Sequence, residues 1–227
     1  MDSGLTKQIL RTMPLFKDMG QCKRDLIADK SHFINLKKGD FLVHKGDSCT
    51  GFYITVYGNI KISFISMAGK EHVVRIVGPG QSFSEAMMFL EQPSPTTVQT
   101  ITDAKVLFVP RSVIFQCVSD DATCMNSMLA GLSREILLLG SELESLTLDS
   151  SQQRVIKCLL QYLRPENTKF SKSSVELPAS KSTIALHLNL APETLSRVLH
   201  RLSKKELIQV EGKVIRILDI EKLRSLN

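Results

Sequence analysis

Residues 180–202 are the segment that most restricts the fold of this 227-residue chain. Apolar residues between Ile184 and Leu188 fit one face of a short helix, and Asn189 can adopt the left-handed conformation that ends it. Pro192 suits the first turn of a second helix, where its missing N–H costs nothing. The segment therefore predicts two helices joined by a tight turn. The buried stripe of the second helix would be Leu195, Val198, Leu199 and Leu202.

The face opposite this stripe carries Glu193, Ser196 and Arg197. Such a helix after a tight turn is typical of a DNA-reading helix-turn-helix, although an ordinary helical hairpin would show the same apolar pattern. Arg197 can contact O6 and N7 of a guanine, Glu193 can accept from the N4 amine of cytosine, and Ser196 can bond to several bases. We also predict phosphate contacts, which position the protein without specifying sequence. The candidates are Lys181, Ser182, Thr183, Arg201, Lys204 and Lys205, for each of which a solvated surface group is the alternative.

The sequence after this pair continues as Leu207–Val210, a Glu211-Gly212 turn and Lys213–Leu218, which predicts the hairpin wing of a winged helix. A helix capped by Asp149 or Ser150 is expected before the pair, and a short closing helix at the C-terminal end. We expect double-stranded DNA to be the partner of residues 149–227, a prediction that the net charge of +6 and the isoelectric point of about 9.1 suit without proving.

Residues from about 31 to 115 have a different pattern, in which short β-branched and aromatic runs alternate with glycine turns. The runs are Phe52–Tyr57, Ile60–Phe64, His72–Val77 and Val106–Val109. Many short strands at near-even spacing predict a β-roll of jelly-roll type. The fold class is therefore α+β, with a sensor roll in residues 1–120 that begins with helical sequence up to about residue 30.

A helix is predicted over residues 121–148, with apolar residues spaced alternately four and three apart. This heptad seam usually meets a copy of itself, so we predict a homodimer, with packing on the roll of the same chain as the alternative. Gly140 should weaken the helix locally. The seam consists of Met125, Leu129, Leu132, Ile136, Leu139, Leu143 and Leu146.

Composition narrows the class of protein further. The sequence has no run of 18 apolar residues and no signal-peptide pattern at its start, so no membrane partner is expected. Five scattered cysteines favour reduced thiols and a cytoplasmic location over a disulfide framework. No nucleophile–base pair, metal motif or phosphate-binding glycine loop is present in the sequence, which argues against an enzyme.

A roll, a heptad helix and a winged helix in this order resemble the CRP/FNR family of bacterial transcription regulators, over nearly the whole chain. The runs Glu85-Ala86-Met87-Met88-Phe89 and Pro192-Glu193-Thr194-Leu195-Ser196-Arg197 are most similar to the Dnr-like regulators of denitrification. The resemblance implies a response to nitric oxide through a b-type heme, and RNA polymerase as a further partner. It also implies a palindrome of TTGAT and ATCAA half-sites separated by four base pairs, because Ser196 stands where CRP-type readers carry Gly.

The effector is the part of the function that the sequence defines least. Cyclic-nucleotide members of the family place an Arg ten residues after a Glu, but here Glu85 is followed at that distance by Pro95 and then Thr96, which argues against cyclic AMP. The expected effector pocket involves Glu85, Met87, Met88 and Phe89, although the three apolar residues would equally suit a core. An iron–sulfur cluster is not expected, because only Cys22 lies in the N-terminal region that holds it in the oxygen sensors.

A heme would need an axial ligand, and His32, His44, His72 and His187 are the candidates. His200 is more typical of a surface position. Two other functions remain open at this point: a regulator of the same fold that responds to another small ligand, and a regulatory module of cyclic-nucleotide type.

Overall fold

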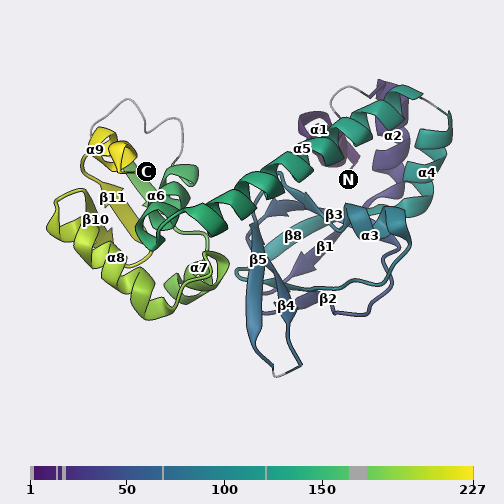
Figure 1. Cartoon of the computed structure of the whole chain (residues 1–227). Coiled ribbons are helices and arrows are strands. Elements are labelled where there is room, and N and C mark those ends of the chain that lie inside the picture. Colours follow the sequence, from purple (N-terminus) through teal and green to yellow (C-terminus); the bar gives the residue numbers. More distant parts are fainter. Residues whose placement is uncertain are drawn as a thin grey trace. The chain divides into compact units, whose positions relative to one another are not determined.

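The computed structural model describes residues 3–13, 15–16, 19–67, 69–120, 122–163 and 173–226. The chain forms two compact units, residues 1–138 and 139–227 (Figure 1). The long helix α5, Ala122–Leu148, contributes to both units. None of the described helices combines the length and the apolarity that a membrane crossing requires.

The N-terminal unit contains two four-stranded antiparallel sheets. The first has the order β1 (His32–Leu36), β8 (Ala104–Pro110), β3 (Gly51–Tyr57) and β6 (Ser82–Phe83). The second has the order β2 (Phe41–Val43), β7 (Thr97–Thr100), β4 (Ile60–Ile65) and β5 (Glu71–Val77). The predicted β-roll and the α+β class are thus confirmed.

The core of the roll is made by inward-facing side chains from both sheets. Tyr53 stacks on Phe83 with ring centroids 5.3 Å apart, and Phe108 packs on Tyr53 at 5.2 Å. Alternation along β3 sends Phe52 and Ile54 to the opposite face of the first sheet, where both are fully buried. The roll core also contains Val43, Ile60, Val77, Val98, Ala104 and Val106.

Helices cover that opposite face of the first sheet. They are α1 (Ser3–Thr12), α2 (Gln21–Lys30), α4 (Arg111–Asp120) and the first part of α5. Phe16 stacks on Phe52 at 6.1 Å, and Cys117 and Cys124 lie in the same core. Helix α5 comes so close to the segment after α1 that a Cβ on Gly131 would lie 2.4 Å from Cδ2 of Leu15.

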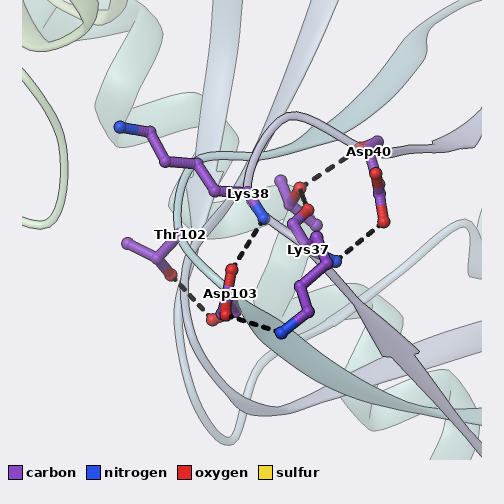
Figure 2. A network of polar contacts seen from close by, with 6 residues as sticks. Lys37, Lys38, Asp40, Thr102 and Asp103 are labelled. Atoms are coloured by element: carbon purple, nitrogen blue, oxygen red, sulfur yellow. Dashed lines mark hydrogen bonds and ion pairs between the residues drawn. The ribbon is translucent and has the colours of Figure 1, made fainter.

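Two turns at one end of the roll are held together by a polar network (Figure 2). The carboxylate of Asp103 accepts from the backbone N–H of Lys38 at 2.9 Å and from Nζ of Lys37 at 3.2 Å. Asp40 accepts from the backbone N–H of Lys37 at 2.7 Å, and the hydroxyl of Thr102 donates to the carbonyl of Asp103 at 3.0 Å. The hydrogen bond from Lys38 holds the pKa of Asp103 below its ordinary value, so this carboxylate is charged where the two turns meet.

The C-terminal unit is a three-helix arrangement with a small sheet. Helices α6 (Ser151–Gln161), α7 (Lys181–His187) and α8 (Pro192–Lys204) are followed by the hairpin of β10 (Ile208–Glu211) and β11 (Val214–Ile217) and by α9 (Ile220–Ser225). Strand β9 (Ser173–Glu176) pairs with β11, which gives the sheet order β10-β11-β9. Ser150 caps α6 and forms a capping box with Gln153.

The structure differs from the sequence prediction at three places. The strand-rich region does not continue to about residue 115, because Arg111–Asp120 form helix α4. The sequence pattern did not predict four strands of the roll, which are β1, β2, β6 and β7. It also did not predict β9, the third strand of the wing sheet. The predicted strands, the helix over 121–148, the paired helices and the hairpin are confirmed within one to three residues at each end.

Candidate nucleic-acid interface

The turn between α7 and α8 is built as the sequence predicts. Asn189 has φ 52°, the left-handed conformation that ends α7, and Leu190 donates its N–H to the carbonyl of Ala185 at 2.9 Å. Pro192 is the first residue of α8. The guanidinium of Arg154, on α6, donates to the carbonyl of Leu188 at 2.8 Å and so fixes this turn from the third helix.

Helix α8 has a buried and an exposed side. The four predicted core residues are each at most 5% exposed, whereas Glu193, Ser196 and Arg197 are exposed together on the other side. Arg201, Lys204 and Lys205 continue the exposed side toward the end of the helix, and His200 is also exposed. The structure therefore brings the three predicted base-reading side chains together on one exposed face.

The start of α7 carries three predicted phosphate contacts. The hydroxyl of Ser180 accepts from the N–H of Thr183 at 3.2 Å and lies 2.8 Å from the hydroxyl of Ser182. Ser180, which the sequence reasoning missed, is thus the N-cap that places Ser182 and Thr183. Lys181 is half-buried beside them.

Thr194 is a second residue that the sequence reasoning missed. Its hydroxyl accepts a hydrogen bond from Nη2 of Arg197 at 3.2 Å, across one turn of α8. The spacing of three residues on a helix was the signal that could have found it. Arg197 therefore has a partner that orients its guanidinium in the DNA-free chain.

The residues expected at an effector pocket lie on the short helix α3, Glu85–Leu90. Met88 is fully buried in the core between the first sheet and the helices, Met87 is half-buried, and Phe89 packs on Phe115 at 5.7 Å. The exposed Pro95 follows Ser94, whose hydroxyl donates to the carbonyl of Thr96 at 2.9 Å. Met88 is thus a core residue. Position 95 is a proline and supplies no cation of its own.

The histidines considered as heme ligands do not come together. His32 packs on Phe108 at 5.1 Å, His44 stacks on Phe41 at 4.9 Å, His72 is exposed on β5, and His187 belongs to α7. Two cavities among the described residues, one in each unit, have no His in their lining.

The thiols are also not placed as metal ligands. Among the described residues no group of three or more His, Cys, Asp or Glu side chains could hold a metal ion. Burial raises the pKa of Cys158 to about 12, and burial followed by the nearby Asp47 raises the pKa of Cys49. Both thiols are therefore protonated at neutral pH, whereas a metal is bound by the thiolate.

The seam of α5 is exposed in the single chain. Leu132 is half-buried, while Ile136 and Leu143 are 68% and 66% exposed. Met125, Leu129, Leu139 and Leu146 are between 39% and 55% exposed. These apolar side chains form a stripe along α5 that the described chain covers only in part.

Comparisons with known proteins agree with this architecture. Residues 33–121 match the cyclic nucleotide-binding domain family and residues 153–226 match the Crp-like helix-turn-helix domain family. The chain is 28% identical over 214 residues to flp of Lacticaseibacillus casei, a probable transcriptional regulator, covering 94% of this chain and 95% of that protein.

Two solved structures are similar over most of their length. DNR from Pseudomonas aeruginosa is 28% identical with a TM-score of 0.55, covering 97% of each chain. FixK2 from Bradyrhizobium japonicum, at 20% identity and a TM-score of 0.76, covers 87% of this chain and 97% of its own and shows the fold alone. With both domain families matched in this order, the chain belongs to the CRP/FNR family of transcription regulators, which bind DNA and are not enzymes.

Proposed function

We propose that this DNA-binding regulator reads its site as a homodimer, through Glu193, Ser196 and Arg197 of α8. The observation that carries the proposal is the exposure of these three side chains together on the side of α8 opposite its buried stripe. The site would be a palindrome of TTGAT and ATCAA half-sites separated by four base pairs. In a dimer joined along the α5 seam, two copies of α8 enter successive major grooves about 34 Å apart.

The test of base reading compares Arg197→Ala with Arg201→Ala, an exposed residue one turn further along α8. Arg197→Ala should cost about 1–3 kcal/mol on the palindrome and should remove the preference for the guanine. Arg201→Ala should weaken binding equally on matched and guanine-substituted duplexes and lower the salt dependence by about one phosphate contact. Equal losses of Arg197→Ala on both duplexes would mean that Arg197 contacts only phosphate.

The proposed regulation is a shift between two populations of the dimer that differ in DNA affinity. An effector bound in the roll unit would favour the DNA-binding population, and the DNA-bound dimer would contact RNA polymerase. The full-length similarity to family members with both domains supports this over an isolated regulatory module.

Nitric oxide sensed through a b-type heme is the effector that we propose on the similarity to Dnr-like regulators. The support is the run from Glu85 to Phe89, which is similar to the corresponding run of those regulators. Purified protein reconstituted with heme should give a fixed stoichiometry, an absorption change with nitric oxide, and tighter binding to the palindrome. Heme uptake without a stoichiometric end point would exclude this effector and leave the DNA-reading proposal untouched.

Cyclic AMP is not the effector that we propose, because an exposed proline stands where the phosphate-binding cation would be needed. Calorimetric titration with cyclic AMP should give no saturable heat. Binding of cyclic AMP at micromolar concentration would contradict this prediction and would favour a cyclic-nucleotide site in the roll.

A further inference from the structure

A cleft of about 630 Å³ opens on the surface of the N-terminal unit. Its lining residues lie between positions 48 and 115, so none of them belongs to the DNA-reading helices. Three separate segments line it: residues 48–50 before β3, residues 91–93 after α3, and the first two turns of α4. This volume lies within the range of small-molecule sites, roughly 300–1,000 Å³.

The cleft is organised around Arg111. Its backbone N–H donates to the carbonyl of Thr50 at 2.9 Å, which ties the start of α4 to the loop before β3. Its guanidinium lies 4.6 Å from the centroid of the Phe115 ring and forms an ion pair with Glu91. The arginine side chain is 29% exposed and lines the cleft, and its contact with the ring restricts where the guanidinium can lie.

Glu91 occupies an unusual backbone position. It ends α3 with φ 55° and ψ 34°, in the left-handed region that a non-glycine residue seldom adopts. Its side chain is 60% exposed. Glycine or asparagine would end a helix in this conformation with less strain, and strained residues are concentrated at functional sites. The carboxylate of Glu91 forms the ion pair with Arg111, and both residues line the cleft.

The chemistry of the lining selects a class of ligand. Arg111 and Glu91 neutralise each other, so a ligand with a single charge would satisfy one of them and leave the other without its partner. A ligand with both charges can satisfy both, with its carboxylate on the guanidinium and its ammonium on the glutamate. The ring of Phe115, which packs on Phe89, and the side chain of Pro93 add an apolar wall next to the pair.

We propose that this cleft binds a small zwitterion with an apolar side chain, of the class of an α-amino acid or a dipeptide. The guanidinium of Arg111 binds the carboxylate, Glu91 binds the ammonium, and the side chain lies on Phe115. The site is additional to the DNA-reading face and does not depend on the proposed nitric oxide response.

The test uses three probes that differ only in charge: L-phenylalanine, 3-phenylpropanoate, which lacks the ammonium, and 2-phenylethylamine, which lacks the carboxylate. Calorimetric titration of the full chain without DNA should show L-phenylalanine binding at about 1 mM or below, and more than about tenfold tighter than either analogue. Equal affinity for all three probes, or no binding of L-phenylalanine up to about 10 mM, would overturn the proposal.

Two variants assign the contacts. Glu91→Gln should make L-phenylalanine and 3-phenylpropanoate bind equally, because the ammonium loses its partner. Arg111→Gln should remove the advantage of L-phenylalanine over 2-phenylethylamine. Lys7→Gln, which breaks the ion pair with Asp25 on α1 and α2, is the matched control and should leave the order of the probes unchanged.

Glu91→Gln tests the site even if Arg111→Gln does not fold, because Glu91→Gln changes only an exposed side chain at the end of a helix. A preference for L-phenylalanine over 3-phenylpropanoate that survives Glu91→Gln would rule out the site. Because no DNA is present, a negative result would leave the DNA-reading proposal standing.

Discussion

Ile136→Ala should weaken dimerisation, and the size of the effect follows from the exposure of this side chain in the single chain. Ile136 is 68% exposed on the seam of α5, at an a position of the heptad. Fully burying an isoleucine stabilises by about 1.5–3 kcal/mol, so covering the exposed part gives about 1–2 kcal/mol in each chain. A two-fold axis makes both copies of residue 136 part of the same interface.

The alanine variant keeps one methyl group and loses the rest of this burial in both chains. We therefore expect a loss of about 2–3 kcal/mol per dimer. This is a rise of about 30- to 160-fold in the dimer dissociation constant. Sedimentation equilibrium over a range of protein concentrations measures this constant directly.

Leu137→Ala is the matched control for this prediction. Leu137 is the next residue of α5 and is 74% exposed, but it occupies a b position outside the seam. It should leave the dissociation constant within about twofold, since a b side chain faces away from a two-stranded interface. Equal weakening by both variants would show that a different face of α5 forms the contact, and no effect of either would place the dimer interface on another element.

Three further predictions concern single side chains. Thr194→Val removes the hydroxyl that orients Arg197 and should weaken binding to the matched palindrome by about 0.5–1.5 kcal/mol in a gel shift. The loss should be smaller on a guanine-substituted site, and Thr194→Ser should restore binding. Gly51→Ala places a Cβ 2.3 Å from the carbonyl oxygen of Val109 and should lower the free energy of unfolding by about 1–3 kcal/mol or more in urea titration. Gly4→Ala is the control and should not lower this free energy, because a Cβ at Gly4 has no heavy atom within 4 Å. Hydrogen bonds from Lys157 and then Ser145 hold the pKa of Asp149 below its ordinary value, so its contribution to stability is present above the unfolded-state pKa and is lost as pH falls through the folded-state pKa. Asp149→Asn should thus lower the melting temperature at pH 7. The difference from wild type should begin to shrink near about pH 4 and should disappear only once the pH has fallen below the folded-state pKa.

Local rules explain why the paired helices could be predicted from the sequence. Asn189 and Pro192 each have a restricted backbone preference, and together they fix where one helix ends and the next begins. The seam of α5 was predictable for a similar reason, because a heptad pattern depends only on the spacing of apolar residues along one helix.

The elements that could not be predicted depend on contacts between distant segments. The sequence of α4 has a short apolar run around Val113 and Phe115, which suits a strand as well as a helix until its packing on α2 and the first sheet is known. Strand β9 has a single apolar residue, Val175, and forms because β11 offers it an edge. The cleft at Arg111 had no sequence signal, since its three lining segments are far apart in the chain.

The effector residues show the same limit. The run from Met87 to Phe89 suited both a ligand pocket and a core, and only the packing of Met88 against the first sheet decides for the core at that residue. Sequence patterns record that a side chain is apolar, whereas its role depends on which surface covers it.

The DNA-reading face is preorganised by contacts that lie outside it. Arg154 fixes the turn from α6, the left-handed Asn189 sets the direction in which α8 leaves it, and Thr194 orients the guanidinium of Arg197. Fixing these groups before binding reduces the entropy that is lost when DNA is bound. Variants at Arg154 should therefore weaken binding to matched and substituted duplexes alike, because they loosen the whole reading helix, while variants at Thr194 should act on the guanine alone. A loss of affinity on both duplexes thus reports on the placement of α8, whereas a loss on the matched duplex alone reports on the orientation of the Arg197 side chain.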